Sequence, residues 1–163
     1  MSHRLRRFLV LTSLRRFNEE PHIHAKILVA ALLISNGVRG DAEAVFYLTD
    51  VDMTVKILGE RVKRLFPDED SSIGYLKKAL SGERLPGVVA RKGAHDLVSG
   101  ILIGPTGKGR CLPSPPFTYV VKLEEYSLEA ECGLGIGRLP PHHQVVVVNI
   151  NADRLLYGRQ PQI

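Results

Sequence analysis

The sequence predicts an α/β domain with a largely parallel sheet. Short runs rich in valine, isoleucine and leucine alternate along the chain with segments whose apolar residues recur at helical spacing. Buried strands that alternate with helices are typical of layered domains whose strands run parallel. The chain has 163 residues, of which 44% are hydrophobic and 24% are charged. We therefore expect residues 1–163 to form one domain around a single core.

The first half of the chain contains five expected elements. The first helix is indicated by apolar residues that recur from Ile23 to Ile34 and stop at Asn36-Gly37. A second helix is expected to be capped by Ser71 or Ser72 and ended by Gly82. In order, the elements are a strand at 8–11, the first helix at 23–34, strands at 44–48 and 55–58, and the second helix up to residue 80.

The second half is expected to continue the alternation. Residues 105–116 are rich in glycine and proline, so they predict an irregular segment. The remaining expected elements are a short strand at 88–89, a helix at 94–102, and central strands at 119–121 and 145–148.

Three glycines near the end of the chain are the strongest indication of a binding site. Gly133, Gly135 and Gly137 alternate with apolar residues ahead of the expected strand at 145–148. Glycines in such a place indicate backbone held close to a ligand. A dinucleotide fingerprint would need a helix after the glycines, whereas two prolines and a strand are expected here. We therefore expect bare amides and carbonyls that hydrogen-bond a flat heterocycle such as adenine.

The charge is uneven along the chain. The net charge is +5, with a pI of about 9.4. Five arginines gather in the first sixteen residues, namely Arg4, Arg6, Arg7, Arg15 and Arg16. Such a cluster fits a phosphate-rich partner, and a solvated surface explains it equally well.

Other features bear on location and on metal binding. No apolar run is long enough to cross a bilayer, and the amino end lacks the apolar segment of a secretory signal. We therefore expect a cytoplasmic protein that does not bind membranes. Cys111 and Cys132 form neither a CxxC pair nor a ligand cluster, so two reduced thiols and no metal site are expected.

Several segments resemble one known family. After the first helix comes Ser-Asn-Gly-Val-Arg-Gly-Asp at 35–41, and Phe-Pro-Asp-Glu-Asp at 66–70 precedes the second helix. Residues 133–139, His142-His143 and the closing 149–153 follow in the matching order. This series is similar to the archaeal tRNA pseudouridine-N1 methyltransferases of the SPOUT superfamily.

The resemblance implies a fold and an activity. The fold would be a SPOUT-type layered domain with a carboxyl-terminal trefoil knot, and the protein would dimerise through its first helix and residues 155–157. The activity would be S-adenosylmethionine-dependent N1-methylation of a T-loop pseudouridine in tRNA. The implied cofactor contacts are Leu112, Gly133, Leu134, Gly135, Ile136, Gly137, Arg138 and Leu139. The expected RNA contacts are Arg6, Arg7, Arg15, Arg16 and Arg39.

The chain also departs from the family pattern. Glu124-Glu125 replaces part of a Gly-Asp-His motif, Gln144 replaces a cysteine near the cofactor, and the helix between them is expected to shrink to 124–131. No catalytic base is identified. Two alternatives therefore stay open: a non-catalytic RNA-binding relative of the same fold, and a nucleoside-binding domain unrelated to RNA.

Overall fold

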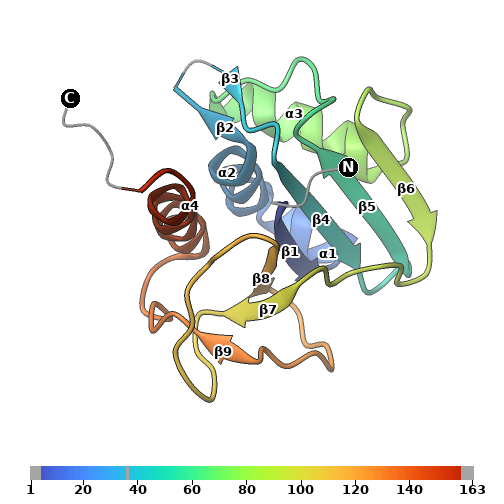
Figure 1. Ribbon diagram of the computed structural model, residues 1–163. Helices are drawn as coiled ribbons and strands as arrows, with labels where there is room; N and C mark the ends of the chain where they lie inside the picture. The colour runs from blue at the N-terminus through green and yellow to red at the C-terminus, as the bar shows by residue number, and fades with distance from the viewer. Residues whose placement is uncertain (1–4, 36, 159–163) are drawn as a thin grey trace.

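A computed structural model describes residues 5–35 and 37–158, and a seven-stranded sheet is its largest element (Figure 1). The order across this sheet is β6-β5-β4-β1-β8-β7-β9. The strands are β1 (Arg6–Thr12), β4 (Ala42–Leu48), β5 (Met53–Leu58), β6 (Val88–Lys92), β7 (Ile101–Gly104), β8 (Phe117–Lys122) and β9 (Cys132–Gly133).

Most of the sheet is parallel, as the sequence predicts. Five strands, β4, β1, β8, β7 and β9, run parallel to one another. β5 and β6 are antiparallel and form one edge. A separate two-stranded ribbon joins β2 (Leu33–Ile34) to β3 (Gly37–Val38). The sheet therefore agrees with the expected mixed α/β architecture.

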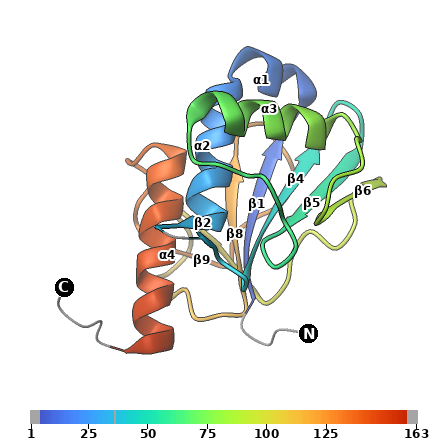
Figure 2. The same ribbon diagram turned by 90° about the horizontal axis from the view of Figure 1, so that it is seen from above.

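Helices cover one face of the sheet and loops cover the other (Figures 1 and 2). In β1, Phe8 and Val10 point into the larger core beneath the helices, whereas Leu9 and Leu11 point into a smaller cluster beneath the loops. This alternation is the two-residue period of a strand buried on both faces. The helices are α1 (Leu14–Glu19), α2 (Pro21–Leu32), α3 (Glu69–Leu80) and α4 (Pro141–Tyr157).

Local chemistry sets the helix ends. The Ser13 hydroxyl accepts from the Arg16 amide at the start of α1. At α3 the cap is Asp68, whose carboxylate accepts from the Ser71 amide at 3.0 Å, so the expected serine cap is wrong by three or four residues. Gly82, with φ of 88°, follows this helix as expected. Within the described residues, no helix is long and apolar enough to span a bilayer.

The expected strand at 145–148 is wrong, because these residues lie in α4. Pro141 occupies the first turn of that helix, where its missing amide hydrogen costs nothing. Val145, Val148 and Ala152 are fully buried, while Val146 is 41% exposed. Burial therefore follows the helical period, which outweighs the strand preference of four consecutive valines.

Two expected helices are also wrong. Residues 94–100 are irregular and lead into β7, because Asp96 and Gly100 both adopt positive φ, which interrupts a helix. Residues 124–131 form a loop over the sheet instead of a helix. The amides of Glu124 and Glu131 donate to the carbonyls of Leu11 and Leu102, so these peptide groups extend the sheet's hydrogen bonding.

The expectation of two reduced thiols is wrong as well. Cys111 and Cys132 form a disulfide that links the loop after β7 to β9. Their spacing of 21 residues carries no motif, and only the fold brings them together.

Candidate functional site

The glycine segment at the end of the sheet passes through a tight backbone crossing. Residues 132–137 run between the two limbs of the loop 104–111. The Gly133 amide donates to the Gly109 carbonyl at 2.8 Å. The amides of Leu134 and Ile136 donate to the carbonyls of Gly104 and Pro105 at 3.2 and 3.1 Å. Backbone therefore contacts backbone on both sides of the segment.

Glycine is required at this crossing for lack of space. A Cβ atom on Gly133 would lie 2.5 Å from the Thr106 carbonyl carbon, and one on Gly107 would lie 2.5 Å from that of Cys132. Real side chains do not tolerate such distances to backbone. Several amides of the segment already donate hydrogen bonds within the chain. Fewer peptide groups are therefore free to bind a heterocycle than the sequence predicts.

A first cavity lies at the carboxyl ends of β7 and β8, and we name it the carboxyl-end cavity. Its volume is about 230 Å³. In open parallel sheets, ligands bind outside the carboxyl ends of the strands. The lining residues come from the end of β7, the end of β8, the loop after β8 and the start of α4: Gly104, Pro105, Thr106, Val120, Val121, Lys122, Leu128, Glu129, Ala130, Pro141 and Gln144.

Gln144 fixes the wall between this cavity and the glycine segment. Its Oε1 accepts from the Tyr119 hydroxyl at 2.8 Å, and its Nε2 donates to the Leu139 carbonyl at 2.8 Å. Burial raises the pKa of the Tyr119 phenol, so this hydroxyl stays protonated and donates. Gln144 therefore holds the end of the predicted cofactor segment against the cavity. The family resemblance identifies the position but not this role.

Opposite charges meet at the edge of the carboxyl-end cavity. The Lys122 Nζ lies 3.8 Å from a Glu129 carboxylate oxygen, and both residues line the cavity. The Glu129 side chain is 93% exposed, so this pair contributes little to stability. The Lys122 ammonium also donates to the Tyr126 carbonyl at 3.1 Å, which leaves two of its three N–H donors for a ligand.

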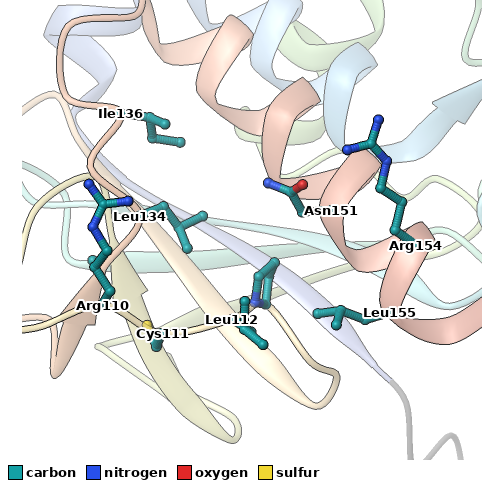
Figure 3. A pocket seen from close by; sticks show the side chains of 10 residues that line it. Arg110, Cys111, Leu112, Leu134, Ile136, Asn151, Arg154 and Leu155 are labelled. Carbon is teal, nitrogen blue, oxygen red and sulfur yellow. The ribbon is translucent and has the colours of Figure 1, made fainter. Parts of the chain in front are cut away.

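A second cavity lies between the loop after β7 and α4, and we name it the loop–helix cavity (Figure 3). Its volume is about 390 Å³. Four predicted cofactor residues, Leu112, Gly133, Leu134 and Ile136, come together in its lining. Gly135, Gly137, Arg138 and Leu139 are not among its lining residues. Leu112 therefore lines this cavity together with part of the glycine segment, and Leu139 does not.

Two of the predicted RNA contacts lie in the interior. Arg6 is 1% exposed, and its guanidinium pairs with Asp41 at 3.0 Å and Asp153 at 2.9 Å. Arg7 is 4% exposed and pairs with Glu43 at 2.5 Å. These arginines hold the start of β1 and present no guanidinium to RNA, so the structure corrects that expectation.

The other predicted RNA contacts are also paired with carboxylates. Arg39 shares Asp153 with Arg6 and is largely buried. Arg15 is 64% exposed and pairs with Glu19 and Glu124, while Arg16 pairs with Glu20. Arg4 lies outside the described residues.

Two arginines that line a cavity were not among the predicted RNA contacts. Arg110 and Arg154 line the loop–helix cavity, and neither forms an ion pair with another described residue. They lie 44 positions apart outside any motif, so only the fold brings them together. In the part of the chain that the structure describes, no group of three His, Cys, Asp or Glu residues could hold a metal ion.

Comparison with known proteins relates part of the chain to an enzyme. No protein-family model matches the sequence. Over 74 residues, the chain is 35% identical to the tRNA (pseudouridine(54)-N(1))-methyltransferase of Methanopyrus kandleri. The matched region is 41% of this chain and only 36% of that enzyme. Over less than half of its length, the chain is thus similar to a tRNA methyltransferase, in agreement with the family that its motifs resemble.

Proposed function

We propose that this protein is an S-adenosylmethionine-dependent RNA methyltransferase that methylates N1 of a T-loop pseudouridine in tRNA. The observation that carries the proposal is the partial match to the Methanopyrus kandleri enzyme, whose name states N1-methylation of pseudouridine 54 in tRNA. The mostly parallel sheet, with a cavity at its carboxyl ends, supports it by offering a ligand site where such sheets bind ligands.

We place the cofactor in the carboxyl-end cavity. Val120 and Leu128 supply apolar walls for adenine, and Lys122 and Glu129 supply one charge of each sign for the amino and carboxylate groups of the methionine part. The volume of about 230 Å³ is below the usual 300–1,000 Å³ of complete ligand sites. The nucleoside would therefore fill the cavity, while the amino-acid part extends past Lys122 toward solvent.

This placement keeps three residues of the predicted cofactor segment. Gly137 packs against the cavity, because a Cβ on it would lie 3.2 Å from the Thr106 methyl carbon. The Leu139 carbonyl accepts a hydrogen bond from Gln144, which lines the same cavity. The amides of Gly133, Leu134 and Ile136 already donate to backbone carbonyls at the crossing. We therefore assign residues 137–139 to the cofactor site and leave Leu112 to the loop–helix cavity.

The proposed methyl transfer needs few catalytic side chains. The bound cofactor supplies an electrophilic methyl group, and the protein aligns the acceptor nitrogen with it and excludes water. Well-aligned reactants reach effective molarities of about 10⁵ M or more, so a site with few ionisable groups is sufficient. The structure assigns no base that would take the N1 proton.

The backbone crossing supports the proposed trefoil knot. Residues 132–137 contact the chain just after β7 on one side and residues 109–111 on the other. A knotted chain would pass α4 through this loop, and the glycines would give the backbone room to do so. This arrangement fits the SPOUT-type fold that the sequence motifs indicate.

We also propose a homodimer through α2 and α4. An apolar hollow between these helices is lined by Val29, Ala30 and Val146, and Ile150 lies one turn further along α4 and is 44% exposed. Exposed apolar surface of this kind marks interaction sites. Sedimentation velocity should give a dimer for the wild type and a monomer for Val146→Asp, and a monomeric wild type would contradict the proposal.

One observation favours the non-catalytic alternative. Glu124 occupies the place of the family's Gly-Asp-His motif, and its carboxylate accepts from the Ser13 hydroxyl at 2.5 Å and pairs with Arg15 at 3.2 Å. A carboxylate held in this way serves the fold rather than a cofactor. A relative that binds RNA without transferring a methyl group would tolerate this change.

The test of the proposed activity uses labelled S-adenosylmethionine and tRNA that contains pseudouridine. We expect label in N1-methylpseudouridine after nuclease digestion and mass spectrometry, with none from tRNA whose position 54 is uridine. Binding of tRNA without label transfer would establish the non-catalytic alternative. Binding of nucleosides in a thermal-shift panel, without binding of tRNA, would establish a nucleoside-binding domain unrelated to RNA.

A further inference from the structure

The loop–helix cavity combines an apolar floor with positive charge. Leu112, Leu134, Ile136 and Leu155 provide the apolar surface, whereas Arg110 and Arg154 come from opposite walls (Figure 3). No acidic residue is among its lining residues. The nearby Asp153 is already paired with Arg6 and Arg39. Among the residues that the structure describes, the cavity therefore offers two guanidinium charges and no acidic lining residue.

The backbone of Arg110 is fixed by the segments next to it. Its backbone forms a bridge with Gly133, and the next residue, Cys111, is joined by the disulfide to β9. Its guanidinium lies over Gly135, where a Cβ would be 3.2 Å from Nη2. The missing side chain of Gly135 therefore leaves the space that Arg110 occupies. The backbone of Arg110 is therefore fixed beside the cavity, so binding costs less backbone entropy than it would for an arginine on a mobile loop.

The chemistry of the lining matches a nucleotide. Guanidinium groups bind phosphate through paired hydrogen bonds, and bases stack on apolar side chains or on arginine planes. Asn151 on α4 adds an amide, which carries both a donor and an acceptor for a base edge. A phosphate between Arg110 and Arg154 would leave the base over Leu112 and Leu134.

We propose that the loop–helix cavity binds one nucleotide of the RNA substrate, with its phosphate between Arg110 and Arg154. This inference rests on the proposed function and names the RNA contact of the same enzyme. The glycine segment separates the two cavities: residues 133, 134 and 136 line this one, and residues 137–139 adjoin the carboxyl-end cavity. RNA held here would therefore lie beside the proposed cofactor.

The test compares two double variants of equal charge. Arg110→Gln/Arg154→Gln removes both guanidinium groups from the cavity. Arg84→Gln/Arg91→Gln removes two exposed guanidinium groups, one just before β6 and one on it, at the opposite edge of the sheet. All four residues are exposed, so both variants should fold, which circular dichroism and thermal melts would check. Affinity for fluorescent tRNA is measured across a series of salt concentrations, and affinities for S-adenosylmethionine and adenosine monophosphate are measured by calorimetry.

We expect the cavity variant to bind tRNA at least tenfold more weakly than the control variant. The slope of log affinity against log salt should fall by about 0.7, because one phosphate of a single strand is no longer neutralised. Affinity for S-adenosylmethionine should not change. Leu134→Ala, which removes a base platform and no charge, should weaken tRNA binding without changing the salt slope.

Three results would overturn the inference. Equal tRNA affinity for the two double variants would show that this cavity does not contact RNA. A cavity variant that loses only cofactor affinity would show that the cavity holds the cofactor. A cavity variant that loses only affinity for adenosine monophosphate would show a free-nucleotide site. In contrast, failure of the wild type to bind tRNA would contradict the proposed function itself.

Discussion

At the scale of single residues, the glycines near the carboxyl end show how far sequence patterns reach. Their spacing correctly indicates a place where backbone is approached closely. At Gly133, however, the approaching group is the backbone of Thr106 and Gly107, not a ligand. A pattern of glycines predicts missing side chains and leaves open what fills the space. The contact could not be foreseen, because it joins segments more than 25 residues apart.

The crossing makes Gly133 the most sensitive glycine to test. Gly133→Ala would bring Cβ within 2.5 Å of the Thr106 carbonyl carbon, so the backbone must shift. We expect destabilisation of about 3 kcal/mol in urea unfolding. Gly109→Ala is the matched control, because its Cβ would meet nothing within 4 Å, and it should change stability by about 0.5 kcal/mol or less. Equal effects for the two variants would show that the crossing is looser than described.

At the scale of elements, burial decides between helix and strand where local preference misleads. The valines of α4 have strand propensity, yet the helix follows two prolines and buries every third or fourth residue. β1, β4 and β8 were predictable because they are continuous apolar runs at the centre of the sheet. Residues 94–100 and 124–131 were not, since their loop form depends on contacts with β1, β5 and β7.

The ion pairs of the arginine cluster also depend on contacts between elements that the sequence does not reveal. They lead to a prediction about β1 and α4. Arg6 on β1 bonds to both Asn149 and Asp153 on α4. Arg6→Met would leave Asp41 without its guanidinium partner and Asp153 with Arg39 alone, so we expect a loss of about 3–5 kcal/mol in the free energy of unfolding. Arg15→Met, at an exposed position, should cost about 1 kcal/mol or less. If Arg6→Met instead reduced tRNA affinity without changing stability, Arg6 would be shown to contact RNA.

At the scale of the whole molecule, the fold class followed from the sequence more completely than the site did. Alternating apolar runs predicted a mostly parallel sheet, which the structure confirms. The site is assembled from four separate segments around the ends of β7 and β8, whereas the sequence signal lay in the glycine segment beside them. Gln144 became interpretable once Tyr119 and Leu139 were seen at its two ends. The unpaired arginines of the loop–helix cavity had no sequence signal.

The central claim is that the carboxyl-end cavity binds S-adenosylmethionine, and calorimetric titration tests it most directly. Thr106→Trp would fill this cavity from an exposed position, whereas Ser127→Trp places the same side chain on an exposed loop outside the lining. We predict that the wild type and Ser127→Trp bind the cofactor equally, and that Thr106→Trp binds at least tenfold more weakly, a loss of about 1.4 kcal/mol or more. Equal affinity for all three proteins, or no binding by the wild type, would contradict the claim.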